Sequence, residues 1–187
     1  MQSLIPQAYW IGLLILASIG TPDAKANSIL YTYTYTGNVF SSAVGVYDTN
    51  DYVHGYFTLT SPLGSNFPYS QITPLTFSYF DGHVTVDSSN YNSLPGYIWY
   101  YVSTDDNGNV QAWRFQLLSQ DGTILTFNTP GGNRRDGGYL GLDLNNNGEN
   151  SGNPGVWVVS ATVVPEPSTF IPLSLALLAI AFKALRR

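Results

Sequence analysis

The sequence predicts an all-β fold: an antiparallel β-sandwich or a jelly-roll-like domain, between an N-terminal signal helix and a C-terminal hydrophobic helix. Three observations lead to this fold class. The central part of the chain is rich in Tyr, Thr, Val, Gly and Asn, which favour strands and tight turns. Several short stretches alternate in side-chain type from one residue to the next, as half-buried strands do. Asp-Gly and Asn-Gly pairs separate such stretches at the spacing of hairpins.

About eight or nine stretches carry the strand pattern. Ser28–Thr36 shows it most clearly, because tyrosines occupy one face and threonines the other. Asp81-Gly82 and Asn107-Gly108 are expected hairpin turns. The expected strands are 28–36, 52–60, 75–80, 84–87, 97–103, 110–118, 123–128, 139–144 and 156–163. Loops are expected at 61–74, 129–138 and 145–155.

The start of the chain has the features of a signal peptide. Trp10–Ile19 is an apolar run with the length of a signal-peptide core, too short to span a bilayer. Ala24 and Ala26 supply the small-x-small pattern of a signal peptidase cleavage site. We therefore expect 1–26 to be removed during export. The alternative interpretation of the apolar run is a buried core segment.

The end of the chain is a tail with three parts. Pro165 and Pro167 keep the backbone around Glu166 extended and solvated, a suitable shape for a protease groove. The segment 170–182 has no charge, and a helix over 170–185 rises roughly 24 Å, short against the ~30 Å core of a bilayer. Basic residues follow and are expected to stop transfer on the cytoplasmic side. They are Lys183, Arg186 and Arg187.

The order of these parts resembles the PEP-CTERM sorting signal, with Pro165-Glu166-Pro167 as its motif within 164–187. The resemblance implies that an exosortase-type enzyme recognises the motif and removes the tail. It also implies a Gram-negative host that makes exopolysaccharide, a precursor held transiently in the inner membrane, and a final location at the envelope surface or outside the cell. The stretches 51–59 and 108–113 loosely resemble other small exported β-proteins with this signal. A plain C-terminal membrane anchor is the alternative.

The composition of the remaining domain, 27–163, narrows the possible partners and cofactors. It holds ten acidic and three basic residues, a formal net charge of 3 − 10 = −7. A nucleic-acid partner is not expected, because phosphate binding needs a basic face. The chain has no cysteine, which excludes disulfides and thiolate metal sites. The domain must therefore fold through its apolar core alone.

One loop has the spacing of a calcium site. Its pattern resembles the start of an EF-hand-type loop, with Gly148 at the sharp turn. The twelfth position is Pro154, where the pattern requires a bidentate Glu. A polar loop without an ion is therefore favoured, and Ca²⁺ is kept as the one possible cofactor. The candidate ligands are Asp143, Asn145, Asn147 and Glu149.

Aromatic residues on one face of a predicted strand could bind sugars by stacking. Tyr97, Trp99 and Tyr101 share such a face. An interior position is favoured for this face and for the tyrosines of 28–36, because aromatic rings supply much of a buried core. An exposed position would instead indicate a carbohydrate-binding module for exopolysaccharide. Trp113 is expected in the core, opposite Arg114.

The sequence gives little support for a catalytic site. The histidines, His54 and His83, do not lie in a nucleophile-elbow context, and most acidic residues fall at turns, where Asp is common for backbone reasons. We therefore expect a non-enzymatic surface or extracellular-matrix protein. A carbohydrate-binding module is the alternative.

Overall fold

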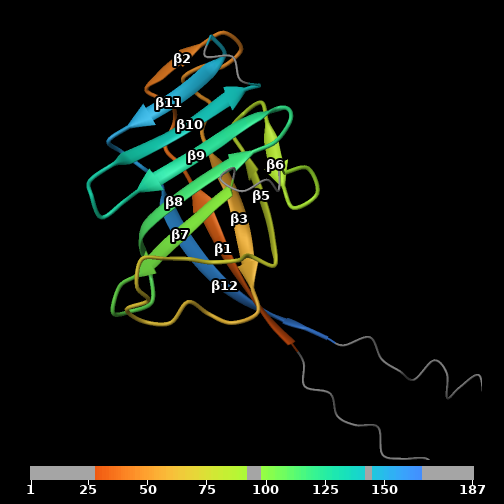
Figure 1. Cartoon of the computed structure of the whole chain (residues 1–187), viewed down its shortest axis with the longest axis vertical. Coiled ribbons are helices and arrows are strands. Elements are labelled where there is room, and N and C mark those ends of the chain that lie inside the picture. The colour runs from red at the N-terminus through yellow and green to blue at the C-terminus, as the bar shows by residue number, and fades with distance from the viewer. Residues whose placement is uncertain (1–27, 92–97, 142–144, 166–187) are drawn as a thin grey trace, which may run out of the picture. The chain divides into compact units, whose positions relative to one another are not determined.

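The computed structural model describes residues 28–91, 98–141 and 145–165 of the 187-residue chain. Within these ranges the regular elements are all strands, and they form two antiparallel sheets (Figure 1). Ser28–Val164 is one compact unit. The all-β prediction is confirmed for this part of the chain. Of the two architectures that the sequence left open, the sandwich is the one that these sheets form.

The first sheet has the strand order β12-β1-β3-β5-β6. Its outermost pair joins the two ends of the domain, because β12 lies antiparallel to β1 over nine residue pairs without a register shift. The strands of this sheet are β12 (Val156–Val164), β1 (Ser28–Thr36), β3 (His54–Leu59), β5 (Thr76–Phe80) and β6 (Thr85–Asp87).

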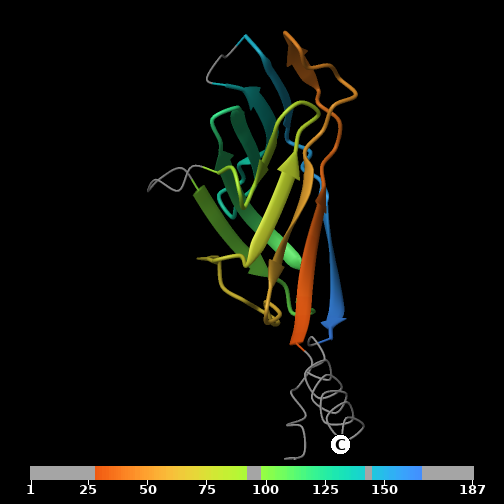
Figure 2. The same ribbon diagram turned by 90° about the vertical axis from the view of Figure 1, so that its right-hand side faces the viewer.

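The second sheet has the order β2-β11-β10-β9-β8-β7-β4, so that β7 to β11 form a meander of consecutive strands. In Figure 1 this meander lies across β1, β3 and β12, and Figure 2 shows the two layers from the side. The strands are β2 (Ser42–Val44), β11 (Asn147–Ser151), β10 (Arg134–Leu140), β9 (Gly122–Asn128), β8 (Val110–Leu118), β7 (Ile98–Thr104) and β4 (Ser70–Gln71).

Aromatic side chains from both sheets form the core. Phe57 is fully buried, and its ring stacks on Tyr33 of the same sheet with 4.7 Å between centroids. Across the interior it meets Phe115 of the second sheet at 5.7 Å. The predicted interior positions of the tyrosines on β1 and of Trp113 are confirmed. The other members of this core are Tyr35, Phe40, Tyr47, Val53, Leu63, Phe77, Tyr79, Val84, Val86, Tyr100, Val102, Trp113, Leu117 and Ile124.

The two predicted hairpin turns are confirmed. Gly82, between β5 and β6, has a φ of 107°, and Gly108, between β7 and β8, has a φ of 82°. Both values lie in the left-handed region that glycine adopts most easily. At the first turn the buried Asp81 carboxylate accepts the backbone N–H groups of His83 and Val84 at 2.9 and 2.7 Å. The local hydrogen bonds therefore fix this turn, as the Asp-Gly pair indicates.

Two regions that we expected as loops contain strands. β11 lies within the predicted loop 145–155, and most of β10 lies within 129–138. Neither strand alternates apolar and polar residues. Backbone pairing holds the two strands instead, with Gly138 opposite Gly148. A β-carbon at Gly148 would collide with the ring of Phe40. The expected turn at Gly148 is therefore wrong: this residue lies inside a strand, packed against a core ring.

The predicted signal peptide 1–26 and the sorting signal beyond Pro165 lie outside the described residues. Their helices stay predictions. Within the residues that the structure describes, no helix is long and apolar enough to cross a membrane. Pro165, the first residue of the motif, directly follows β12 and is exposed.

Candidate functional site

The outward face of β7 carries two of the three predicted stacking residues. Tyr100 and Val102 are buried, at 3% and 0% exposure, so Trp99 and Tyr101 point away from the core and are half-buried. The interior position that we favoured for them is wrong. Tyr97 lies outside the described residues.

Arg114 of the neighbouring strand β8 lies against this outward face. It is paired with Tyr101 in the ladder, and its guanidinium carbon lies 3.7 Å from the centre of the Trp99 ring. The same carbon is 5.3 Å from the centre of the Phe127 ring. These are cation–π distances, so the charge holds the rings in place.

Tyr69 completes the surface from the segment before β4. Its ring stacks on that of Tyr101, with 5.7 Å between centroids and 27° between the planes. Burial raises the pKa of Tyr69, so its hydroxyl stays protonated and can donate. We define the aromatic face as Tyr69, Trp99, Tyr101 and Arg114.

The aromatic face combines apolar rings with hydrogen-bond donors, the combination of groups that stacking against a sugar uses. Its ring faces offer apolar surface to the C–H groups of a sugar, and its phenol and guanidinium groups are hydrogen-bond donors. Sequence reasoning misjudged it because both faces of 97–103 carry apolar rings. The signal that could have found it is on the next strand, where Arg114 and Gln116 alternate with buried Trp113 and Phe115. Their pairing with β7 then fixes which of its rings face outward.

The proposed calcium ligands are only partly described. Asp143 lies outside the described residues, whereas Asn147 and Glu149 lie on β11 and Asn145 lies two residues before its start. Glu149 forms an ion pair with Arg135 at 2.8 Å. Within the described ranges no group of three or more His, Asp or Glu side chains could hold a metal ion. The calcium site stays a prediction. The sharp turn at Gly148, on which its EF-hand geometry was based, is absent, because Gly148 lies within β11.

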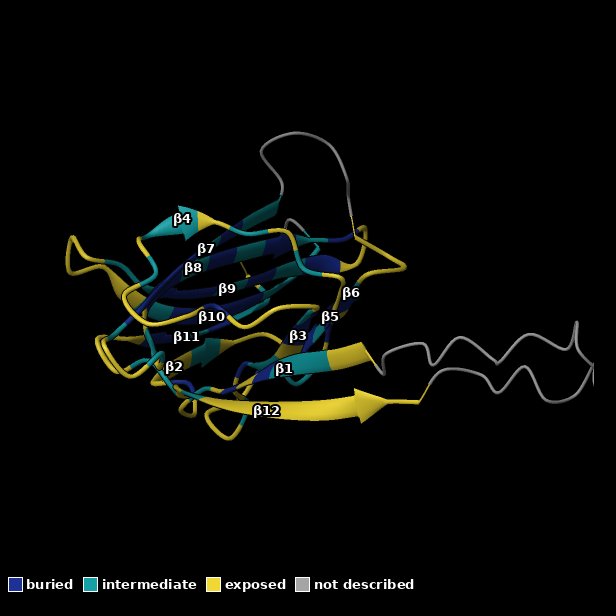
Figure 3. Cartoon of the chain, turned by 90° about the horizontal axis from the view of Figure 1, so that it is seen from below, coloured by how far each residue is buried: buried dark blue, intermediate teal, exposed yellow. Residues whose placement is uncertain are grey.

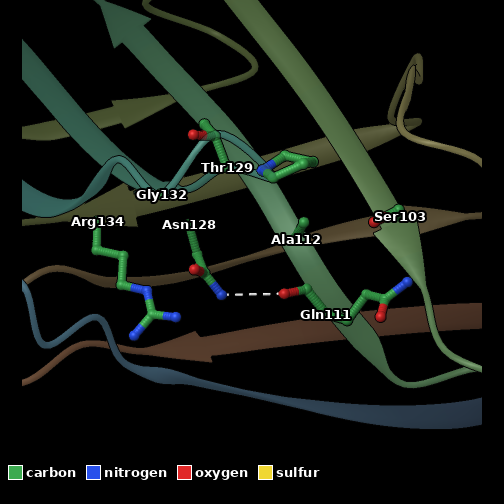
Figure 4. A pocket seen from close by; sticks show the side chains of 8 residues that line it. Ser103, Gln111, Ala112, Asn128, Thr129, Gly132 and Arg134 are labelled. Atoms are coloured by element: carbon green, nitrogen blue, oxygen red, sulfur yellow. Dashed lines mark hydrogen bonds between the residues drawn. The ribbon is translucent and has the colours of Figure 1, made fainter.

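A polar pocket of about 370 Å³ opens beside the end of the second sheet (Figure 4). It lies between the start of β8, the end of β9 and the loop that leads to β10. The Asn128 amide donates to the backbone carbonyl of Gln111 at 3.0 Å and holds its wall. Amide, hydroxyl and guanidinium groups line it, so its chemistry is hydrogen bonding. The lining residues are Ser103, Gln111, Ala112, Asn128, Thr129, Pro130, Gly132 and Arg134.

The two histidines lie apart from both surfaces. The ring of His54 packs edge-on against Phe80 at 5.4 Å. His83 lies at the β5–β6 turn, with its Nε2 atom 3.1 Å from a carboxylate oxygen of Asp51. Its ring contacts the ring of Tyr47 at 4.7 Å. Both histidine rings therefore make packing contacts within the fold.

Asp136, on β10, is a fully buried acid that the sequence analysis did not single out. The Tyr35 hydroxyl lies 2.8 and 2.9 Å from its two carboxylate oxygens and donates to this group. Burial raises the pKa of Asp136 to about 6, although hydrogen bonds from Thr126 and Tyr35 oppose the shift. The Tyr35 oxygen also accepts the backbone N–H of Gly155 at 2.7 Å. This network ties the segment before β12 to the second sheet.

Comparison with known proteins found no matching family model, no matching curated protein and no matching solved structure.

Proposed function

We propose that this chain is an exported, non-enzymatic protein that is sorted through a PEP-CTERM-type tail and acts at the cell surface or in the extracellular matrix. The observation that carries the proposal is the agreement between two sets of boundaries. The terminal motifs delimit a mature domain of 27–163, and the compact unit runs from Ser28 to Val164. The expected processing points thus fall beside the ends of the fold.

The pairing of the first and last strands also supports this proposal. Ser28 lies opposite Val164, so both ends of the domain leave at the same end of the β1–β12 pair. The described strand pairs all lie within Ser28–Val164, and removal of both terminal segments would break none of them. Pro165, the first residue of the motif, is exposed directly after β12. A processing enzyme could therefore reach the motif without unfolding the domain.

The proposal is tested by Glu166→Ala in the native host. We expect this variant to lose Met1–Ala26 but keep its tail and stay in the membrane fraction, because the recognised motif is damaged. Fractionation and intact-mass measurement check this result. Asp106→Ala, in an exposed hairpin turn, is the control and should be released like the unchanged protein. Equal release of both variants would contradict recognition of the motif, and loss of Met1–Ala26 shows that export succeeded.

A second function, binding of exopolysaccharide, is favoured by the aromatic face. Trp99 and Tyr101 point outward, and Arg114 and Tyr69 pack beside them. Rings that serve only the core would point inward, as Tyr100 does. The acidic charge of the domain favours a neutral chain over a strongly anionic one.

Trp99→Ala should weaken binding of the host's purified exopolysaccharide about tenfold, or ~1.4 kcal/mol, because one stacking ring is lost. Titration calorimetry measures the affinity, and thermal unfolding checks that the variant is folded. Tyr52→Ala, 36% exposed and next to the first sheet, is the control and should bind like the unchanged protein. If both variants bind equally well, the aromatic face is not the binding surface.

A further inference from the structure

β12 differs from the other edge strands of the sandwich. It has nine residues, whereas β6 and β2 have three and β4 has two. Short edges protect a sheet from pairing with another chain, as do charge, proline and bulges within the edge strand. Val156–Val164 contains no charged residue and no proline, and its pairing with β1 has no register shift. β12 is therefore the one edge, of the four described here, that none of these devices protects.

β12 is also uncovered on both sides. Eight of its nine residues are exposed, and Figure 3 shows this exposure along the strand. Val156 and Val158, at 65% and 64% exposure, lie on the outward face of the sheet. Val159 and Val163 lie on the opposite face and are 41% and 55% exposed. No element among the described residues covers the edge, although its side chains are suited to burial.

A groove continues the inner side of this edge. It has a volume of about 360 Å³ and lies between β12 and the loops at 62–65 and 107–109. Val159 and Ala161 form one wall, and Pro62 and Leu63 form part of the other. Tyr31 and Tyr33 of β1 also line it, so the groove lies over the inner face of β1 and β12, next to the free edge at which a strand would add.

We propose that β12 pairs antiparallel with β12 of a second copy of this chain, across a two-fold axis. The two five-stranded sheets then become one continuous sheet. In such a pair each strand offers the same residues to the other, so the interface is self-complementary. About every second residue of an edge strand directs its N–H and C=O groups away from the sheet, and the partner strand would satisfy them.

Charge favours a second copy as the occupant. Residues 28–47 and 150–165 contain no charged side chain, although the domain as a whole carries a formal charge of 3 − 10 = −7. Two copies joined at β12 therefore bring uncharged strands against each other. A partner that recognised the protein by charge would dock on the acidic loops instead.

The direction of pairing links this interface to processing, a step that rests on the proposed function. Antiparallel pairing sends the two Val164 ends away in opposite directions, about 30 Å apart for strands of nine residues. Two tails held in one membrane would have to leave on the same side. The anchored precursor therefore stays unpaired, and removal of the tail allows the pair to form.

The pairing is tested by sedimentation equilibrium of the protein purified from its host. The tail-free form should be a dimer at micromolar concentration. Val158→Lys should weaken the dimer at least tenfold, because a lysine on an edge strand opposes pairing and the two-fold axis brings the lysines of both copies onto neighbouring strands. The matched control is Val44→Lys on the short edge β2, where the valine is 49% exposed, and it should stay a dimer. Val156→Lys should repeat the effect of Val158→Lys, and thermal unfolding identifies any variant that is not folded.

A monomeric unchanged protein at about 100 μM, or equal weakening by Val158→Lys and Val44→Lys, would overturn the pairing. If the host never removes the tail, the proposed function is wrong. The pairing can then still be tested with the same variants of the tailed protein in detergent, where no shared membrane orients the two tails. Dimers of the tailed form in intact membranes, detected by crosslinking and abolished by Val158→Lys, would support the interface and contradict its dependence on processing.

Discussion

Replacing Phe57 with alanine should lower the free energy of unfolding by about 3–5 kcal/mol, the usual cost of removing a fully buried phenylalanine. Its ring is 0% exposed and lies between the two sheets. It stacks on Tyr33 at 4.7 Å and meets Phe115 at 5.7 Å and Trp157 at 5.5 Å. The substitution removes contacts on both sides of the interior and leaves a cavity that stiff rings cannot collapse to fill.

Urea unfolding of the two proteins at one pH measures this loss. The control is Tyr56→Ala, which changes an aromatic residue next to Phe57 on the same strand. Tyr56 points outward and is 39% exposed, so its removal should cost below about 1 kcal/mol. Equal losses for Phe57 and Tyr56 would contradict the assignment of Phe57 to the centre of the core.

Acidification from pH 7 to pH 4 should stabilise the domain through Asp136. Burial raises the pKa of this carboxyl from 3.8 to about 6, so the folded state binds its proton more tightly than the unfolded chain does. The contribution of Asp136 to the free energy of unfolding is therefore greatest below pH 4. It falls by about 3 kcal/mol as the pH rises through 6, at ~1.36 kcal/mol per pH unit.

The measurement is the free energy of unfolding as a function of pH for the unchanged protein and for Asp136→Asn, which cannot titrate. The difference between the two curves isolates Asp136, because Asp81, whose pKa burial also raises, is present in both. The unchanged protein should lose stability relative to the variant between pH 4 and 6. A difference that is flat, or that rises with pH, would contradict the buried, ionisable state of Asp136.

The strands and turns that could be predicted from the sequence are those that form through their own local residue pattern. β1 alternates tyrosine and threonine, and this pattern alone assigns its inner face. Asp81-Gly82 makes its turn through local hydrogen bonds and a left-handed glycine. β8 was assigned correctly because Arg114 alternates with buried aromatic residues.

Other elements depend on their neighbours, and the sequence could not predict them. β11 is polar and forms because β10 and β2 pair with its backbone. The orientation of Trp99 on β7 depends on its pairing with β8, because both faces of β7 carry aromatic rings. The network of Asp136 and Tyr35 joins residues 101 positions apart, which no local pattern reveals. Trp99 and Tyr101 were therefore predicted as a pair of stacking residues, but the interior position favoured for them is wrong, and Tyr69 and Arg114 were not predicted as part of the face.

The central claim is that the chain is exported and then released by removal of its tail. Its most direct test is the intact mass of the protein recovered from the native host, measured separately in the membrane fraction and the medium. We expect a species in the medium that lacks Met1–Ala26 and the residues after about Pro167. A protein found in the membrane alone, with 170–187 still attached, would contradict release and identify a tail-anchored envelope protein instead.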